Sequence, residues 1–191
     1  MTARATAKRA SASSKSTAGR ERLGAHVSIA GGTPEAPPRA RAIGASAMQM
    51  FTKMANRWAE RSVDDAERAA FRIAMRDTRV GVTVAHDSYL INLASPDPAL
   101  RRRSIESFVA ELQRCRALGV AYLVSHPGNY MDDRESGVRR NADAITEALQ
   151  RVPGRTVVCM ETTAGSGTAI GGTFAELARL IELVPDRKSV V

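Results

Sequence analysis

The sequence predicts an α/β fold in which helices cover a parallel β-sheet. Three observations favour this fold. Short apolar segments alternate with helical stretches five times, the apolar segments begin 25–40 residues apart, and each of the three histidines stands at the end of one such segment. Repeated strand–helix units indicate a parallel sheet, because a helical crossover is what connects one parallel strand to the next.

Five strands and five helices are predicted along the chain after residue 21. The strands are expected at residues 22–28, 47–53, 81–87, 121–128 and 156–162. The helices are expected at roughly residues 35–43, 64–77, 98–118, 134–151 and 173–183. Ser62 and Asp64 are candidate caps for the second helix, and Gly119 is expected to end the third.

The third helix shows the amphipathic pattern best. Its apolar residues recur at helical spacing and are Leu100, Ile105, Phe108, Leu112, Cys115 and Leu118. Arginines occupy other positions, so we expect one stripe of this helix to face the core and the rest to face water.

The spacing of the strands suits a (β/α)8 TIM barrel, in which eight units take roughly 250 residues. Only about the first five βα units fit into 191 residues. After the fifth helix the chain reads VPDRKSVV, at the place where a sixth strand should begin. A flavodoxin-like domain also has about five strands and is the structural alternative.

Composition and charge are typical of a globular domain, expected at 22–191, that follows a basic segment. No apolar run approaches the ~20 residues that cross a bilayer, so we expect no membrane partner. The two cysteines lack metal-site spacing, which predicts a reduced, cytoplasmic protein. Residues 1–20 hold five Lys or Arg and no acidic residue, within a net charge of +8. We expect 1–21 to be a disordered basic arm with weak, salt-sensitive attraction to nucleic acid, although transit peptides have a similar composition.

The unusual residues of the chain fall at the ends of the predicted strands. His26, His86 and His126 end the first, third and fourth strands. Lys53 ends the second strand and Glu161 ends the fifth. Each has an ordinary structural explanation when taken alone, such as a hydrogen-bonded histidine. Strand ends of a parallel barrel meet on the face where chemistry occurs, however, and this convergence favours a joint site.

Two imidazoles and a carboxylate make His86, His126 and Glu161 candidate ligands of a divalent metal. Zn²⁺ binds neutral imidazole nitrogen at ~2.0–2.1 Å and carboxylate oxygen at ~2.0–2.2 Å. Three protein ligands leave positions for water or a second metal, which is typical of catalytic sites. A carboxylate can also bridge two metals that cleave a phosphodiester, so Glu161 is the candidate catalytic residue.

Residues 51–58, which read FTKMANRW, combine Lys53, Arg57 and Trp58 in a loop. This loop is either a solvated turn anchored by the tryptophan or a nucleic-acid contact, in which cations bind phosphate and side chains enter beside a base step. Tyr89 is either a packed core residue or an inserted wedge.

The glycine-rich segment 162–172 follows Glu161 directly. It matches neither a P-loop nor a dinucleotide-binding fingerprint. It is either a flexible connection between strand and helix or a backbone that approaches a phosphate closely.

At these residues the chain closely resembles the endonuclease IV family of apurinic/apyrimidinic endonucleases. The match runs from about Leu23 to Pro185. It consists of the motifs GAHVSIAGG, MFTK…RW, HDSYLINLA, RCRALG, SHPG and ETTAGSGTAIGG, in the family's order. The combination of HDSYLIN with SHPG and ETTAG is specific to that family.

The resemblance implies a (β/α)8 barrel with three zinc ions on its C-terminal face. His86 and His126 would bind the first zinc, and Glu161 would bridge the first and the second. The implied activity is hydrolysis of DNA 5′ to an abasic sugar, leaving a 3′-hydroxyl, together with removal of blocked 3′ ends in base excision repair. The partner would be double-stranded DNA containing abasic sites, bound by a monomer in the bacterial cytosol or nucleoid.

The resemblance also implies a set of DNA contacts. These residues are Tyr89, Arg57, Asn56, Lys53 and His26. Where the family usually reads Arg-Gln-Trp, this chain has Asn56-Arg57-Trp58, so either Asn56 or Arg57 takes the inserting position. Two further positions depart from the family pattern, with Tyr130 where His is common and Ser166 where Gln is frequent.

By the resemblance, the remaining zinc ligands lie beyond residue 191. We therefore expect a C-terminally truncated family member that completes only the first zinc site and has little activity alone. Two alternatives remain from the residues themselves. A metal-dependent sugar isomerase or epimerase would use the same barrel, and a flavodoxin-like binding domain would hold no zinc. The cations, Tyr89 and the basic arm favour a polyanion over a small sugar.

Overall fold

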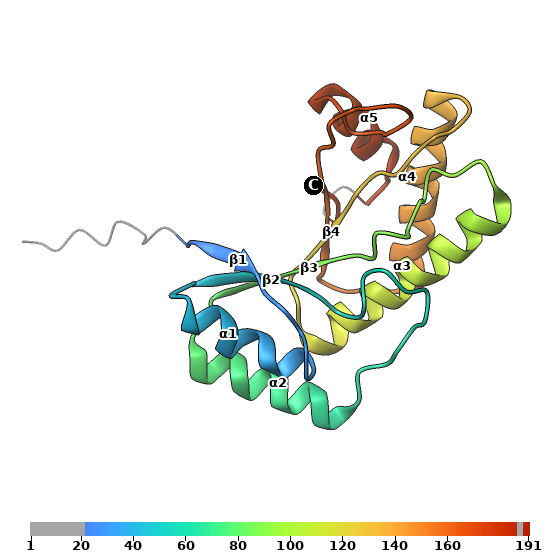
Figure 1. Cartoon of the computed structure of the whole chain (residues 1–191). Helices are drawn as coiled ribbons and strands as arrows, with labels where there is room; N and C mark the ends of the chain where they lie inside the picture. The colour runs from blue at the N-terminus through green and yellow to red at the C-terminus, as the bar shows by residue number, and fades with distance from the viewer. Residues whose placement is uncertain (1–21, 187–188) are drawn as a thin grey trace, which may run out of the picture.

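A five-stranded parallel sheet lies at the centre of the computed structural model, which describes residues 22–186 and 189–191 (Figure 1). The strands are β1 Gly24–His26, β2 Ala47–Phe51, β3 Val82–His86, β4 Tyr122–Ser125 and β5 Val157–Met160. They pair in the order β1-β2-β3-β4-β5. A flavodoxin-like sheet reverses its strand order at a switch point, so the consecutive order excludes that alternative. The basic arm predicted for residues 1–21 lies outside the described residues.

Helices cover the outer side of this curved sheet. They are the 3-10 turn η1 Thr33–Glu35 and the helices α1 Ala36–Ala42, α2 Asp65–Thr78, α3 Pro98–Leu118, α4 Arg134–Arg151 and α5 Phe174–Leu183. Figure 1 shows α1 and α2 beside the first strands and α4 and α5 at the other end, so the layers form an arc. The prediction of an α/β barrel represented by five βα units is confirmed, and each predicted strand and helix is found within a few residues of its expected place.

Capping residues fix the ends of the helices. The Asp64 carboxylate accepts a hydrogen bond from the backbone N–H of Glu67 at 2.7 Å. Asp64, and not Ser62, is therefore the N-cap of α2. Gly119 ends α3 in the left-handed conformation with φ 76°, as its sequence position predicts. The other helices with side-chain N-caps begin after Asp97, Asp133 and Thr173.

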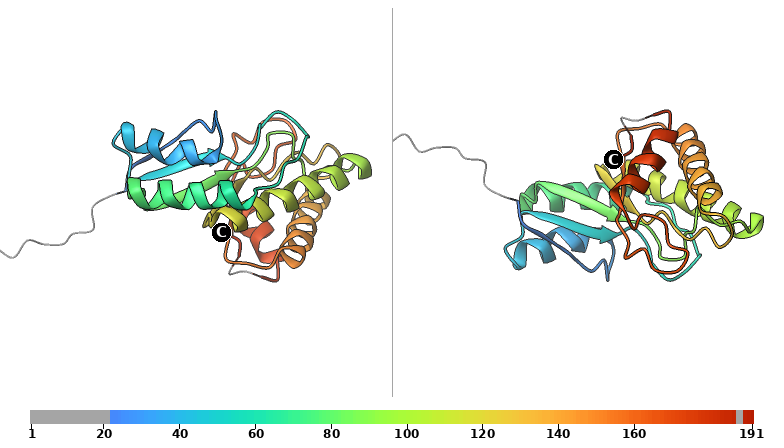
Figure 2. Two further views of the ribbon diagram at one scale, coloured as in Figure 1. Left: turned by 90° about the horizontal axis from the view of Figure 1, so that it is seen from below. Right: turned by 90° about the horizontal axis from the view of Figure 1, so that it is seen from above.

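The register of the sheet brings three candidate ligands to one edge. Ser125 lies opposite Met160 in the β4–β5 pair. The next residues, His126 and Glu161, therefore leave the sheet side by side. His86 ends the neighbouring strand β3 at the same edge. The two views in Figure 2 show that the loops following β2, β3, β4 and β5 gather on this side of the molecule.

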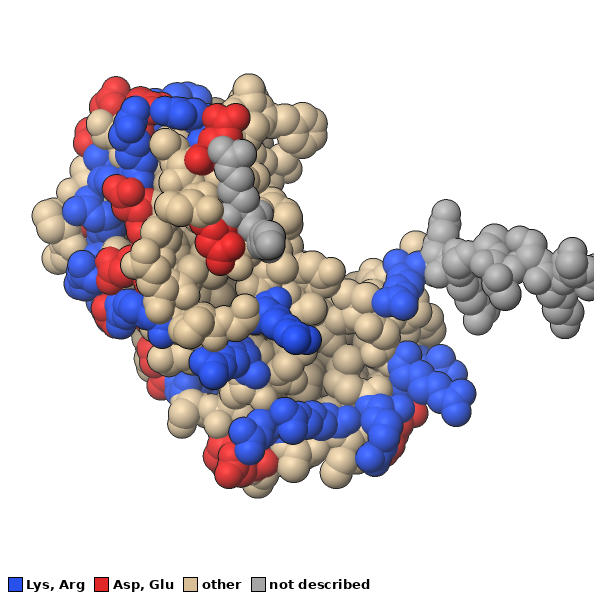
Figure 3. Space-filling model, turned by 180° about the vertical axis from the view of Figure 1, so that it is seen from behind, with Lys and Arg blue, Asp and Glu red and all other residues tan. Residues whose placement is uncertain are grey.

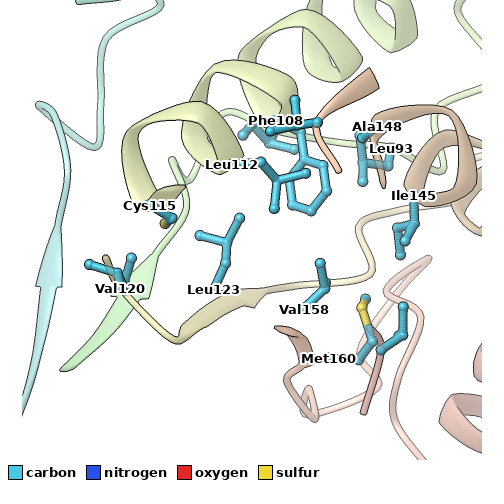
Figure 4. Close-up of a cluster of buried hydrophobic side chains, with 14 of the residues drawn as sticks. Leu93, Phe108, Leu112, Cys115, Val120, Leu123, Ile145, Ala148, Val158 and Met160 are labelled. Atoms are coloured by element: carbon cyan, nitrogen blue, oxygen red, sulfur yellow. The ribbon is translucent and has the colours of Figure 1, made fainter. Parts of the chain in front are cut away.

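The hydrophobic core lies between the sheet and helices α3 and α4 (Figure 4). Phe108 and Leu112 of α3 face Leu123 of β4 and Val158 of β5, and all four side chains are buried. Burial of each such side chain contributes roughly 1.5–3 kcal/mol. The predicted apolar stripe of α3 is confirmed except at its first residue, Leu100, which is half-buried.

Residues 189–191 lie along the edge of β5. The backbone N–H of Val158 donates to the carbonyl of Ser189 at 2.8 Å, and that of Val191 donates to the carbonyl of Val158 at 2.9 Å. Val158 and Val190 form a parallel bridge. These residues thus form an isolated bridge to β5, near the place where the sequence predicts a sixth strand.

Charged side chains of both signs cover the outer face of the helices. Figure 3 shows basic and acidic groups alternating along the left edge of the molecule when it is seen from behind. Arg151 of α4 donates to Glu106 of α3 at 2.6 Å and to Glu147 at 3.2 Å. Such exposed pairs stabilise a fold only weakly. Among the described residues, no helix combines the length and the apolar character needed to cross a bilayer.

Candidate metal centre

Three side chains from neighbouring strands converge at the carboxyl edge of the sheet. Nε2 of His86 lies 3.1 Å from Oε2 of Glu161, and Nε2 of His126 lies 3.6 Å from the same oxygen. Ligands placed about 2.0–2.2 Å from one tetrahedral ion lie roughly 3.3–3.5 Å apart, so both separations suit a shared Zn²⁺. Among the residues that the structure describes, this is the one group of His, Cys, Asp or Glu with such an arrangement.

The hydrogen bonds of His86 indicate which ring nitrogen is available to a metal. Its Nδ1 lies 2.9 Å from the carbonyl oxygen of Asp87, and because a carbonyl can only accept, Nδ1 carries the proton. In a neutral imidazole, Nε2 is then an acceptor that faces Glu161, which is also an acceptor. Two acceptors at 3.1 Å need a proton or a cation between them. A divalent metal fits this arrangement, and the bond at Nδ1 is the support that metal-binding histidines usually have.

Asp87 connects the ends of β3 and β4 beneath the cluster. Its Oδ2 accepts a hydrogen bond from Oγ of Ser125 at 2.6 Å, and its Oδ1 lies 3.7 Å from Nδ1 of His86. Burial raises the pKa of Asp87 well above its usual range, and the charges of Glu111 and Glu161 add to this effect. The bond to Ser125 holds the two strand ends that carry the histidines at a fixed separation.

Two asparagines that sequence reasoning missed hold the loop that carries His126. The buried Asn141 of α4 donates to the carbonyl oxygen of Pro127, the residue after His126, at 2.6 Å. Asn92 accepts from the backbone N–H of Asn129 at 2.9 Å and donates to its carbonyl at 3.1 Å. Gly128 makes this approach possible, because a Cβ there would clash with the Asn92 side chain. The signal that could have revealed this contact is Asn92 at the end of the motif HDSYLIN together with Asn129 directly after the motif SHPG.

Aromatic rings connect two further candidates to the cluster. The Phe51 ring at the end of β2 lies 4.5 Å from His26, 5.7 Å from His86 and 5.3 Å from Tyr89, measured between ring centroids. Nδ1 of His26 lies 3.1 Å from Nε2 of Gln49. Partial burial, followed by the charge of His86, lowers the pKa of His26. His26 is therefore a neighbour of the metal cluster and does not belong to it.

Tyr89, Asn56 and Arg57 are exposed on the rim above the cluster. Tyr89 is 65% exposed, which excludes the alternative of a core tyrosine. Its backbone N–H donates to the carbonyl of Ala55 at 3.1 Å, and Oγ of Ser88 donates to the same oxygen at 2.6 Å. The loops after β2 and β3 are joined by these two bonds.

Lys53 lies differently from the other predicted rim residues. It is only 3% exposed. Its Nζ lies 3.0 Å from Oε1 of Glu60 and donates to the carbonyl of Arg57 at 2.7 Å. The loop folds back over Lys53, and Glu60 neutralises its charge. Lys53 is therefore not placed as an exposed rim cation that could contact phosphate, as the sequence suggested. Trp58 is half-buried, and the Arg103 guanidinium lies 4.4 Å from its ring centre, as expected of an anchoring tryptophan.

The glycine-rich loop after Glu161 is folded on itself. The backbone N–H of Thr163 donates to the carbonyl of Gly171 at 2.9 Å. The N–H groups of Gly171 and Gly172 donate to Oε2 of Glu176 at 2.7 and 3.1 Å. These two amides are occupied by the carboxylate of the following helix, and they are not free to approach a phosphate.

The fold and this open cluster at its strand ends define the class of protein. The chain belongs to the xylose isomerase-like TIM barrel family, whose model matches residues 37–191. Its relatives narrow this class to one branch. The chain is 45% identical over 166 residues to "Probable endonuclease 4" of Chloroflexus aurantiacus, and the aligned region covers 86% of this chain and 58% of the relative. A protein of the same name from Geobacter sulfurreducens is 41% identical over 172 residues.

These relatives confirm the resemblance to the endonuclease IV family. The chain spans about 58% of the length of the two relatives. Among solved structures, endonuclease IV of Thermus thermophilus superposes with a TM-score of 0.77 at 35% identity, covering 89% of this chain and 61% of that one. A D-psicose 3-epimerase superposes with a TM-score of 0.70 at 17% identity, which shows the fold alone.

Proposed function

We propose that this chain carries the first metal position of a zinc-dependent DNA repair endonuclease. The proposed reaction is hydrolysis of the phosphodiester 5′ to an abasic site, leaving a 3′-hydroxyl, and removal of 3′ blocking groups. The observation that carries the proposal is the convergence of His86, His126 and Glu161 on one edge, next to the exposed Tyr89. The similarity to proteins named endonuclease 4 supports it.

The three ligands would hold the metal through Nε2 of each histidine and a carboxylate oxygen. Bound zinc supplies a Lewis acid that stabilises the negative charge developing on the phosphate. Glu161 directs Oε2 towards both histidines, and no described residue forms a hydrogen bond to its Oε1. A second oxygen free of protein donors suits the bridging role that the family resemblance implies.

The exposed rim residues would bind the DNA partner. Arg57 supplies a cation for a phosphate, and Asn56 beside it supplies a polar side chain. An abasic site lacks one base in the stack, and the exposed Tyr89 ring offers an aromatic surface for that gap. His26 would line the same edge beside Phe51. Lys53 is not included, because Glu60 occupies its ammonium group.

Metal binding provides the first test. The purified chain, equilibrated with zinc and separated from free metal, is expected to retain about one zinc per chain by elemental analysis. Replacement of a ligand, as in His126→Ala, should lower the zinc affinity measured by calorimetry by a large factor. His26→Ala is the matched control, because His26 lies outside the cluster. Equal zinc content in all variants would contradict the proposed site.

DNA binding provides the second test and separates the endonuclease from a sugar isomerase or epimerase. A duplex with one abasic site should bind the zinc-loaded chain, as a monomer, more tightly than the intact duplex. The affinity should fall steeply with salt. Tyr89→Ala should reduce the preference for the abasic duplex. Binding of ketose sugars without binding of DNA would favour the isomerase alternative. We expect chelator-sensitive incision to be weak for the 191-residue chain.

A further inference from the structure

Buried charges fill the space between helix α3 and the loop of residues 52–61. Arg114 and Glu111 of α3 are 2% and 1% exposed, and Nη2 of Arg114 lies 3.0 Å from Oε1 of Glu111. Nε of Arg114 donates to Oγ1 of Thr52, the first loop residue, at 2.7 Å. The Thr52 hydroxyl in turn donates to Glu111. The side chain of Thr52 is therefore fixed by an ion pair that belongs to a different element.

Glu60 closes this network at the other end of the loop. Its carboxylate accepts from Nη1 of Arg114 at 2.7 Å and from Oγ of Ser107 at 2.6 Å, and it lies 3.0 Å from Nζ of Lys53. Burial alone raises the pKa of Glu60, but the hydrogen bonds from Ser107, Lys53 and Arg114 outweigh it and lower the pKa. Two buried cations thus meet the buried Glu111 and the partly exposed Glu60, and such pairing is the condition under which buried charges are tolerated.

The network holds the loop backbone as well as its side chains. Nη1 of Arg114 donates to the carbonyl of Arg61 at 3.1 Å, and Nζ of Lys53 donates to the carbonyl of Arg57 at 2.7 Å. Asn56 and Arg57 themselves point to solvent. The rim residues of this loop therefore owe their position to charged groups beneath them.

We infer that Glu60 and Arg114 are positioning residues, which hold the 52–61 loop so that Asn56 and Arg57 are presented to DNA. This inference rests on the proposed DNA-binding function. A preformed loop binds more tightly than one that must be ordered during binding, because the loss of side-chain and backbone freedom has then already occurred. Neither residue touches DNA in this role, so their effect is transmitted through the loop.

The single tryptophan of the chain provides a probe within this loop. Trp58 is half-buried, so its fluorescence reports whether the loop stays in place. Glu60→Gln removes the charge that Arg114 and Lys53 share while leaving the Arg114–Glu111 pair intact. In the zinc-loaded chain we expect a red-shifted Trp58 emission and stronger quenching by acrylamide, with unchanged zinc affinity and circular dichroism. The matched control is Glu106→Gln, which removes an exposed ion pair between α3, the helix that carries Arg114, and Arg151 of α4. It should leave the Trp58 signal unchanged.

DNA binding by the same variants tests the second half of the inference. For Glu60→Gln we expect the Kd for an abasic duplex to rise on the order of tenfold in a chain that stays folded by circular dichroism. The melting temperature should fall, because the buried Lys53 loses its anionic partner. A released loop with unchanged DNA affinity, or an unchanged Trp58 signal, would overturn the inference. Failure of the parent to bind abasic DNA would contradict the proposed function. The Trp58 fluorescence would still show whether Glu60 holds the loop in place.

The double variant Glu111→Leu/Arg114→Met tests the inference even if Glu60→Gln does not fold. It removes a buried ion pair as a unit, a change that proteins often tolerate without loss of stability. It also deprives Glu60 of its main partner, so it should reproduce the Trp58 shift and the weaker DNA binding of Glu60→Gln. A folded double variant with parental values of both would refute the role of Arg114.

Discussion

The loop after β2 and the loop after β5 both lead from a strand end to a helix on the same rim, but different bonds hold them. Residues 52–61 are held by charged side chains, chiefly Arg114 from a helix that lies far along the chain. Residues 162–172 are held by their own backbone and by Glu176 at the start of the next helix. The first loop therefore depends on tertiary structure, and the second depends on local sequence.

This difference matches what each loop presents. The glycine-rich loop follows Glu161 directly and fixes the backbone next to a candidate metal ligand. The other loop presents the exposed side chains of Asn56 and Arg57, which would contact DNA in the proposed function. Support from below by buried charges leaves the upper surface of that loop free for a partner.

Arg114→Met is expected to cause the largest loss of stability, because it removes the tertiary support of the 52–61 loop. Glu111 would be left buried without its cation, a change that typically costs about 3–5 kcal/mol. Urea unfolding, followed by circular dichroism, measures the loss. The double variant Glu111→Leu/Arg114→Met should recover most of it. A single variant as stable as its parent would show that the buried pair does not support the fold.

Gly171→Ala tests the local support of the second loop. Gly171 has φ 91°, and an added Cβ would lie 3.1 Å from Pro127 and 3.2 Å from Leu177. Strained backbone and crowding together should destabilise the chain by about 2 kcal/mol. Gly154→Ala is the control, since its Cβ would have no contact closer than 3.9 Å and no positive φ is involved. Thermal unfolding that gives equal values for both variants would argue against a strained loop.

Thr173→Ala tests the start of α5, the helix that supports the glycine-rich loop. The Thr173 hydroxyl accepts from the backbone N–H of Glu176 at 3.2 Å and so begins α5. Loss of such a cap costs about 1 kcal/mol, and Thr173→Ser should retain most of it. Chemical denaturation resolves a difference of this size. No difference between the alanine and serine variants would mean that the cap contributes little.

Glu106→Gln should have the smallest effect on stability. Glu106 pairs with Arg151 on the exposed side of the helix that carries Arg114. Exposed pairs contribute about 0.2–1 kcal/mol, and salt screens them. Unfolding at low and high salt should therefore show a small loss that shrinks as salt is added. A loss comparable with that of Arg114→Met would remove the distinction between buried and exposed charge on α3.

The sequence predicts local features of this molecule well. Asp64 is recognisable as a cap from its place before an amphipathic stretch, and Gly119 is recognisable as a helix end. The convergence of His86, His126 and Glu161 could also be expected, because the carboxyl ends of neighbouring parallel strands share one edge. Each of these predictions needs only the pattern within one βα unit and the parallel order of the units.

The environment of Lys53 could not be predicted in that way. Its basic character and its place at a strand end suggested an exposed cation, but Glu60 folds back over it and Arg114 reaches Glu60 from more than fifty positions along the chain. The same holds for Asn141, whose amide supports the residue after His126 from within a helix. Side chains of this kind are placed by packing between elements, and periodicity within one segment gives no information on it.

The consecutive order of the strands has a consequence for folding. Each strand pairs with the one before it, so every pairing closes the loop of a single βα unit, as between Ala47 of β2 and Val82 of β3. Parallel pairing across a helical crossover is slow to form, because the loop must close before the pairing stabilises it. The consecutive order still allows each unit to add to the edge of the one before it, so the rim that carries His86, His126 and Glu161 can be assembled in the order in which the chain is synthesised.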